Sequence, residues 1–340
     1  MPERSRRRVV FVNEASASIG MGHILRSQVL ARGMHLRGYA ISGITIGDER
    51  AVSYATERAR QDGFEWPIRL AQNVQAAIEQ LLQDAPPVIV VDCAIASADI
   101  VQACAGKPIA VVVLDYFLAE PPLPTAVINL IDHNPGTLAG HPPDREGVAY
   151  FEGPQYAIIR DEFRVAREYR MQRGEHASIG NILVAFGGAD PSGNSQRALE
   201  MITQWPGRFH IDLVIGPLFN AAIEQLAEKF QHKCVLKTHA SPSYLGKLFD
   251  EADVVFCGGG GTLLEALCVG VPAIVIAQND AEYRHAQSLA QRGACWLLDQ
   301  SEWTLLNAAE NREQLSKCAR ACVDGRGADR ICDVIEQQSN

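Results

Sequence analysis

VVFCGGGGTLLEALCVGVP, residues 254–272, joins an apolar run of strand length to a helical pattern through four consecutive glycines. The run ends at Cys257, and Gly258–Gly261 form the turn. Thr262 is placed to cap the helix, with Glu265 three residues later at the spacing of a capping box. Glycines let a backbone approach a ligand closely, and a helix N-terminus offers N–H groups and partial positive charge. The stretch therefore predicts a turn that binds a diphosphate without a lysine; an ordinary tight turn is the alternative.

The same alternation of strand-length runs and helical patterns extends in both directions along the 340-residue chain. Its Val- and Ile-rich runs are typical of parallel strands buried on both faces. We expect strands at residues 8–13, 40–47, 87–93, 109–116, 126–131, 181–188, 209–216, 234–239, 252–259, 272–278 and 294–298, and first-half helices at 23–37, 74–83 and 98–105. This pattern predicts an α/β fold of two doubly wound, Rossmann-like domains that face a central cleft.

A break in the alternation marks the expected boundary between the domains. Residues 132–144, DHNPGTLAGHPPD, form a loop by composition, and the chain becomes polar and charged at about residues 165–178. We therefore expect a first domain at residues 1–165 and a second at residues 166–325. Residues 326–340 would form a terminal helix.

Composition and charge argue against several classes of protein. With 31 Lys and Arg against 40 Asp and Glu, the formal net charge is −9, which disfavours general binding to nucleic acids or anionic membranes. Nine cysteines without a CxxC pair, no signal-peptide core and no apolar run of about 18 residues predict a cytoplasmic protein without a membrane span.

Several catalytic motifs are also missing from the sequence. It contains no GxSxG, GxxxxGKS/T, HExxH or DxD motif. This argues against serine hydrolases, P-loop enzymes, zincins and metal-dependent sugar-nucleotide transferases. We therefore expect neither a metal ion nor a cofactor.

A second glycine turn lies in the same half of the chain as the first. Gly187 and Gly188 follow the run ILVAF and would lie at the same edge of the second sheet, although such glycines are common in strand-to-helix turns. Glu265, one turn inside its helix, could accept hydrogen bonds from ribose hydroxyls. The nucleotide-binding residues predicted from the two turns are Gly187, Gly188, Gly259, Gly260, Gly261, Thr262 and Glu265.

A third glycine turn, SIGMGHILRS at residues 18–27, carries a histidine. Gly20 and Gly22 begin like a G-x-G-x-x-G dinucleotide fingerprint, but Leu25 replaces the third glycine, so NAD binding is disfavoured. His23 would stand at a helix N-terminus facing the cleft. There the helix dipole favours a neutral imidazole that can act as a general base. A core or capping histidine is the alternative.

Further polar residues end the expected strands. Asp92 and Asp115 close VIVVD and VVVLD, where they could orient His23, hold substrate hydroxyls or cap the next helices. Asn134, in IDHNPG, could bind substrate or serve the turn. Asn279, after PAIVIA, is the other candidate for substrate binding.

Four stretches together resemble a known group of enzymes. They are GMGHILRSQVLA (20–31), FEGPQYAIIRDEF (151–163), ILVAFGGADPSGN (182–194) and CGGGGTLLEALCVGVPAIVIAQN (257–279). In sequence and spacing they resemble UDP-sugar hydrolases of the pseudaminic-acid pathway and proteins of the spore-coat-polysaccharide type. Those proteins are relatives of the MurG-type glycosyltransferases with the GT-B fold. The resemblance extends over about residues 9–300.

The resemblance implies a division of labour between the domains. The N-terminal domain would bind the sugar and the C-terminal domain UDP, residues 151–163 would lead into the hinge, and a helix near residues 329–338 would cross back onto the first domain. His23 and Arg26 match the histidine and arginine of the family's G-x-G-H-x-x-R. The predicted catalytic residues are His23 and Asp92, and the predicted substrate-binding residues are Gly20, Gly22, Arg26, Asp115, Asn134 and Asn279.

The reaction implied by the resemblance is release of UDP from a UDP-linked amino or deoxy sugar, in synthesis of surface glycans or nonulosonic acids. His23 would activate water for inverting attack at the anomeric carbon. Two departures bear on this: Asp92-Cys93-Ala94 stands where the hydrolases tend to carry Asp-x-Tyr, and Asn279-Asp280 where they often carry Asn-Gln. The alternatives are a GT-B glycosyltransferase, with an acceptor hydroxyl in place of water, and a non-catalytic protein that binds nucleotide sugars.

Overall fold

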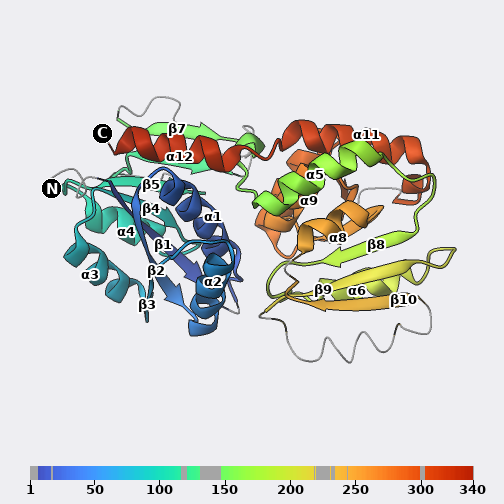
Figure 1. Ribbon diagram of the computed structural model, residues 1–340, viewed down its shortest axis with the longest axis horizontal. Coiled ribbons are helices and arrows are strands. Elements are labelled where there is room, and N and C mark those ends of the chain that lie inside the picture. The colour runs from blue at the N-terminus through green and yellow to red at the C-terminus, as the bar shows by residue number, and fades with distance from the viewer. Residues whose placement is uncertain are drawn as a thin grey trace. The chain divides into compact units, whose positions relative to one another are not determined.

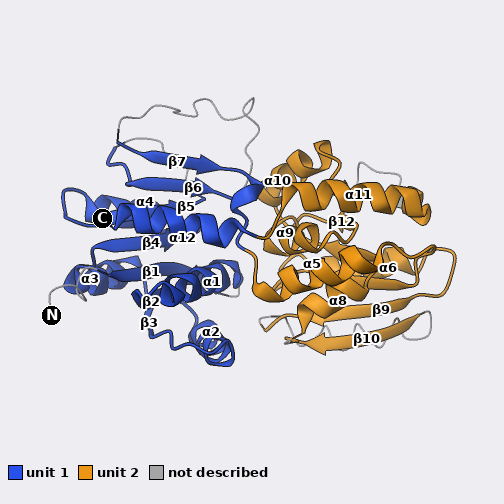
Figure 2. Cartoon of the chain, turned by 45° about the horizontal axis from the view of Figure 1, so that its top comes forward, with its two compact units in different colours: residues 1–158, 326–340 blue, residues 159–325 orange. Residues whose placement is uncertain are grey.

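The computed structural model describes residues 7–16, 18–115, 121–130, 147–217, 219, 230, 234–242, 244–298 and 303–339. The chain divides into two compact units, residues 1–158 with 326–340 and residues 159–325 (Figure 2). Each unit contains one parallel sheet with helices against it (Figure 1). Within the described ranges, no helix has both the length and the apolar character needed to cross a membrane.

The sheet of the first unit has seven parallel strands in the order β3-β2-β1-β4-β5-β6-β7. Their bounds are β1 Arg8–Ala15, β2 Ala40–Gly47, β3 Ile68–Ala71, β4 Val88–Asp92, β5 Ala110–Leu114, β6 Ala126–Asn129 and β7 Ala149–Glu152. The chain order reverses between β1 and β4, which places a topological switch point at their carboxyl ends. Asn13 of β1 pairs with Asp92, the last residue of β4, and β1 continues beyond that pair to Ala15.

Helices connect the strands of the first unit, and the last helix of the chain also belongs to this unit. They are α1 Gly22–Leu36, α2 Glu49–Gln61, α3 Val74–Asp84, α4 Ser97–Cys104, the short 3₁₀ helix η2 Pro154–Tyr156 and α12 Gly327–Gln338. Helix α12 packs beside α1. Arg37, at the end of α1, donates hydrogen bonds of 2.7 Å to both Asp333 and Glu336 of α12. The end of the chain therefore completes the unit in which the chain begins.

The sheet of the second unit has six parallel strands in the order β10-β9-β8-β11-β12-β13. Their bounds are β8 Asn181–Ala185, β9 His210–Ile215, β10 Val235–Ala240, β11 Val254–Cys257, β12 Ala273–Val275 and β13 Trp296–Leu297. The helices are α5 Asp161–Arg173, α6 Asn194–Ile202, α8 Leu245–Glu251, α9 Gly261–Val269, α10 Asp280–Gln291, η3 Trp303–Asn307 and α11 Ala309–Cys322. Here the switch point lies between β8 and β11.

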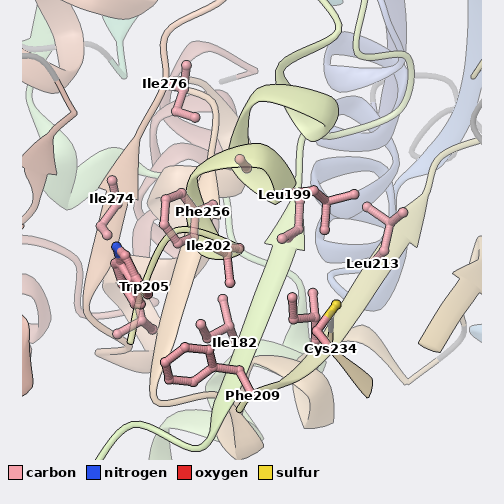
Figure 3. Close-up of a cluster of buried hydrophobic side chains, with 14 of the residues drawn as sticks. Ile182, Leu199, Ile202, Trp205, Phe209, Leu213, Cys234, Phe256, Ile274 and Ile276 are labelled. Atoms are coloured by element: carbon pink, nitrogen blue, oxygen red, sulfur yellow. The ribbon is translucent and has the colours of Figure 1, made fainter. Parts of the chain in front are cut away.

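The second unit buries an apolar core on one face of its sheet (Figure 3). Trp205 packs edge-on against Phe209, with ring centroids 5.8 Å apart, and lies 5.9 Å from the ring of Phe256. Ile182 and Leu213 complete the layer from the neighbouring strands. Burial of such side chains stabilises the sheet and holds the ends of its strands in fixed positions.

The predicted α/β class and both parallel sheets are confirmed. Every expected strand is present, and α1, α3 and α4 lie within one residue of the expected helices. Strands β3 and β7 and helix α2 were not expected. The predicted loop at residues 132–144 lies outside the described residues.

The chain passes from the first unit to the second between Ile158 and Ile159, earlier than the boundary expected at residue 165. The reason is that α5 packs within the second unit. Phe163 contacts Phe249 with ring centroids 5.2 Å apart, and Arg170 donates to the carbonyl oxygens of Asp250 and Ala252. The charged stretch that was expected to mark the boundary therefore includes a helix, α5, packed within the second unit.

Candidate active site

The first glycine turn connects β1 to α1 at the switch point of the first sheet. The N–H of Gly20 donates to the carbonyl oxygen of Ser16 at 2.7 Å, and Gly20 has a left-handed φ of +86°. Gly22 is the first residue of α1. A Cβ atom added at either glycine would meet no described atom within 4 Å, so the turn is open above the start of the helix.

His23 and Asp92 are brought together at this point, although 69 residues separate them. The imidazole Nδ1 of His23 lies 2.7 Å from Oδ1 of Asp92. Asp92 is fully buried, whereas the side chain of His23 is 20% exposed. An ionised carboxylate only accepts hydrogen bonds, so Nδ1 carries the proton in this pair. Among the described residues no group bonds Nε2, which is left as the basic nitrogen.

Arg26, one turn further along α1, holds the same carboxylate. Its Nε and one terminal nitrogen donate to the two oxygens of Asp92 at 3.1 and 2.6 Å. Burial alone would raise the pKa of Asp92. The positive charge of Arg26 and the hydrogen bonds from His23 and Arg26 outweigh burial, and the pKa lies below its ordinary value. Asp92 is therefore ionised at neutral pH.

Asp115 holds the other side of the Arg26 guanidinium. Its Oδ2 accepts from Arg26 at 2.7 Å, and its Oδ1 accepts from the backbone N–H of Leu130 at 2.8 Å. Burial lowers the pKa of Arg26, but the two carboxylates outweigh it and raise that pKa above its ordinary value. The expected contacts of Arg26 and Asp115 with substrate stay predictions, since each side chain is already bonded within the protein. Asn134 lies outside the described residues.

In the second unit, the two glycine turns lie side by side at the switch point. Ala185 at the end of β8 pairs with Cys257 at the end of β11, so Gly187 and the four glycines leave the same edge. A Cβ atom built on Gly187, whose φ is +75°, would lie 3.7 Å from Oγ1 of Thr262. The predicted proximity of the turns is thus observed.

The two helices that begin here differ at their N-termini. At α6, the carboxylate of Asp190 accepts from the N–H groups of Asn194 and Ser195, both at 2.9 Å. At α9, the N-cap residue is Gly260, and no side chain caps the helix. In the described part of the chain, the N–H groups of Gly260, Gly261 and Thr262 have no acceptor. An anion can therefore bind at α9.

The predicted capping box at Thr262 and Glu265 is wrong. Helix α9 begins at Gly261 with Gly260 as its N-cap, so Thr262 already lies inside the first turn and cannot be the cap. Glu265 instead pairs with Arg160, whose Nε and one terminal nitrogen lie 3.1 and 2.9 Å from one carboxylate oxygen. A role for Glu265 in ribose binding stays a prediction.

The sequence did not predict how α10 holds the four-glycine turn. Glu282 accepts the N–H of Gly259 at 2.9 Å, and Nδ1 of His285 lies 2.6 Å from the carbonyl oxygen of Gly259. A Cβ atom at Gly259 would lie 2.4 Å from the carbonyl oxygen of Glu282, so only glycine fits there. The N–H of Gly259 is therefore used within the protein. The sequence signal that could have indicated these contacts is the spacing of Glu282 and His285, three residues apart in the segment after a strand.

Asn279 stands at the beginning of the same helix. Its side-chain oxygen accepts the N–H of Glu282 at 2.9 Å, so Asn279 is the N-cap of α10. The amide nitrogen is not engaged by that bond. The predicted contact with substrate is untested by this geometry, whereas the cap itself is observed.

Comparison with known proteins agrees with this architecture. Residues 197–321 match the glycosyltransferase family 28 C-terminal domain. The spore coat polysaccharide biosynthesis protein SpsG of Bacillus subtilis is 29% identical over 203 residues, which cover 55% of this chain and 58% of SpsG. The chain spans 56% and 58% of the length of the first two curated relatives that it matches.

Solved structures show the fold over nearly the whole chain. MurG of Acinetobacter baumannii superposes with a TM-score of 0.66 at 15% identity, covering 97% of this chain and 99% of MurG. UDP-GlcNAc 2-epimerase of Neisseria meningitidis, solved with UDP-GlcNAc bound, gives a TM-score of 0.62 at 11% identity, covering 97% and 100% of the two chains. The chain has the fold of the GT-B glycosyltransferases.

Proposed function

We propose that the protein is an inverting glycosyltransferase that moves a sugar from UDP to an acceptor hydroxyl, with His23 as general base. The observation that carries the proposal is the His23–Asp92 pair at the switch point, with Nδ1 bonded and Nε2 available. A histidine held this way by a buried carboxylate is fixed in one tautomer and one orientation. Asp92 orients the imidazole, and His23 is the catalytic residue.

In the proposed reaction, the acceptor oxygen attacks the anomeric carbon while Nε2 of His23 takes the hydroxyl proton. The bond from the anomeric carbon to the diphosphate oxygen breaks, and that oxygen keeps the electron pair. Attack opposite the leaving group inverts the anomeric configuration. The products are the glycosylated acceptor, UDP and a protonated His23, which returns its proton to solvent.

The proposal assigns the nucleotide to the second unit. The N–H groups at the start of α9 would stabilise the negative charge that grows on the departing diphosphate. UDP is favoured over other nucleotides by the resemblance in sequence. Two of the similar proteins also carry a UDP-linked sugar in their names: the epimerase, solved with UDP-GlcNAc bound, and an N-acetylglucosamine transferase of Gluconobacter oxydans. The name of SpsG further supports a product that enters a surface polysaccharide.

Hydrolysis is the second candidate, because GMGHILRSQVLA resembles the corresponding stretch of the UDP-sugar hydrolases and matches their histidine and arginine at His23 and Arg26. In that reaction water replaces the acceptor hydroxyl and the free sugar is released. The missing tyrosine of Asp-x-Tyr, with Ala94 in its place, separates this chain from those hydrolases. The missing tyrosine and the match of residues 197–321 to a glycosyltransferase domain together favour the transferase over the hydrolase.

The experiment that tests the proposal measures UDP release from a panel of UDP-linked amino and deoxy sugars. Each is incubated with the protein alone and with a mixture of hydroxyl acceptors from surface-glycan precursors. Release only with an acceptor supports the transferase. Equal release without an acceptor shows the hydrolase. UDP binding without release under any condition contradicts both and indicates a protein that binds nucleotide sugars.

A further inference from the structure

The second unit contains a histidine that links a carboxylate to a tyrosine. His239, near the end of β10, is buried. Its Nε2 lies 2.6 Å from Oδ1 of Asp212 on β9, and its Nδ1 lies 2.9 Å from the hydroxyl oxygen of Tyr244. Tyr244 directly precedes α8. The three side chains form a continuous series, from carboxylate to imidazole to phenol, which the proposed function does not use.

The directions of the two hydrogen bonds follow from the carboxylate. An ionised carboxylate only accepts, so Nε2 of the neutral His239 imidazole donates to Asp212. Nδ1 then keeps its lone pair and accepts from the O–H of Tyr244. No described residue donates to the phenol oxygen, so its lone pairs are available to a second molecule. This is the arrangement of a nucleophile, its base and the group that orients the base.

Strand pairing and ring packing fix this arrangement before any ligand binds. Lys237 of β10 pairs with Asp212, and His239 lies two residues beyond Lys237, so the three side chains share one face of the sheet. The rings of His239 and Tyr244 pack edge to face, with centroids 5.8 Å apart and an angle of 80° between their planes. The phenol is thus held by both its ring and its hydroxyl.

Exposure and charge indicate which reagents suit this tyrosine. Tyr244 is 47% exposed, whereas the side chain of His239 is only 1% exposed, so a reagent reaches the phenol and not the base. In the described part of the chain no lysine or arginine bonds Tyr244, and Asp212 places a negative charge behind the imidazole. An anionic phosphoryl donor is therefore disfavoured, and an uncharged acyl donor is favoured.

We propose that Tyr244 is an acylation site, with His239 as its general base and Asp212 as the residue that orients His239. The phenol oxygen attacks the carbonyl carbon of an activated ester or thioester while Nδ1 of His239 takes the hydroxyl proton. The bond from that carbon to the leaving oxygen or sulfur breaks, and the leaving atom keeps the electron pair and then takes the proton from His239. Asp212 stabilises the imidazolium formed in between. The product is an acyl ester of Tyr244.

The test measures acetylation of Tyr244 by p-nitrophenyl acetate, with each modified residue located by peptide mass spectrometry. Tyr169 on α5 is the internal control, because it is 61% exposed and bonds no histidine among the described residues. Exposure alone therefore predicts faster acetylation of Tyr169. We expect Tyr244 to react at least about tenfold faster, since a positioned general base commonly contributes more than that. Equal or slower acetylation of Tyr244 overturns the proposal.

Three variants separate the effect of the base from that of exposure. His239→Gln should lower the acetylation rate of Tyr244 to about that of Tyr169. Asp212→Asn should also lower it, because an amide neither fixes the tautomer nor stabilises the imidazolium. His176→Gln is the matched control: His176 Nδ1 lies 2.6 Å from Oδ1 of Asp253, and no tyrosine bonds this pair within the described ranges. Its rate of Tyr244 acetylation should equal that of the wild type.

An unchanged rate in His239→Gln contradicts the role of the base. If circular dichroism shows that this variant does not fold, Asp212→Asn decides, since the side chain of Asp212 is 27% exposed and its loss is better tolerated. An unchanged rate there, or an equal fall in His176→Gln, overturns the proposal. Acetylation uses neither UDP nor a sugar, so absence of UDP release would contradict the proposed function and leave this inference standing.

Discussion

At the residue scale, the two positions in the first turn favour glycine for different physical reasons. Gly20 adopts a φ of +86°, a conformation that costs an L-residue about 1 kcal/mol or more. Gly22 has no such constraint, and a Cβ atom there would point into open space. Gly20 therefore shapes the turn, whereas the bare Cα of Gly22 keeps the space beside His23 free.

This difference gives a matched pair of substitutions. Gly20→Ala should lower the free energy of unfolding by about 1 kcal/mol, measured by urea denaturation. Gly22→Ala should leave stability unchanged or slightly higher, because alanine favours a helix more than glycine does. It should nevertheless slow sugar transfer, since the new methyl group enters the space assigned to substrate. Full activity in Gly22→Ala would show that substrate does not use that space.

The residue scale also shows what a sequence can and cannot predict about a site. His23 and Asp92 could be predicted as neighbours, because strand ends and helix starts gather at one edge of a parallel sheet. The bonds of Arg26 could not, because nothing in the sequence shows that one guanidinium spans both Asp92 and Asp115 and does not contact substrate instead. The open start of α9 and the occupied start of α6 look alike in sequence, and only the geometry of Asp190 separates them.

At the element scale, α10 fixes the glycine turn from which α9 begins. Glu282 and His285 are three residues apart and so lie on one face of α10, where they bond the backbone N–H and the carbonyl oxygen of Gly259. Helix α10 is in turn capped by Asn279. The turn is therefore held by a neighbouring helix before any ligand binds, which lowers the entropic cost of binding.

We expect Glu282→Ala to weaken UDP binding about tenfold, which corresponds to roughly 1.4 kcal/mol and to the loss of hydrogen bonds to backbone N–H groups. The measurement is calorimetric titration with UDP. Asp280→Ala is the matched control, because it removes an exposed carboxylate from the same first turn of α10 without touching the glycines. If the two substitutions weaken UDP binding equally, the loss comes from the missing acidic charge that stabilises the N-terminus of α10. That result would contradict a role of Glu282 in holding the turn.

Helices and strands differ in how well their sequence predicts them. Strands such as β1, β4 and β5 were predicted because Val- and Ile-rich runs buried on both faces have a strong pattern. Helix α2 was missed because its buried residues are the alanines Ala51, Ala55 and Ala59, which give little apolar contrast. Strands β3, IRLA, and β7, AYFE, were missed because each has a charged residue among its four and no run of Val or Ile.

At the scale of the whole molecule, the two units repeat one arrangement with different chemistry. Each has a parallel sheet whose strand order reverses once, between β1 and β4 or between β8 and β11. The first switch point carries an imidazole with its carboxylate, and the second carries glycine turns and an uncapped helix start. The proposed function follows from this division: base in the first unit, nucleotide in the second.

The most direct test of this division compares turnover with UDP affinity in His23→Gln. We expect kcat for sugar transfer to fall at least about 100-fold, the contribution of a general base, while calorimetry gives the wild-type Kd for UDP. Glu282→Ala in the same assays should show the opposite pattern, with UDP affinity lost first. Retention of wild-type turnover in His23→Gln, or a loss of UDP affinity equal to that in Glu282→Ala, would contradict the assignment of His23 as the base.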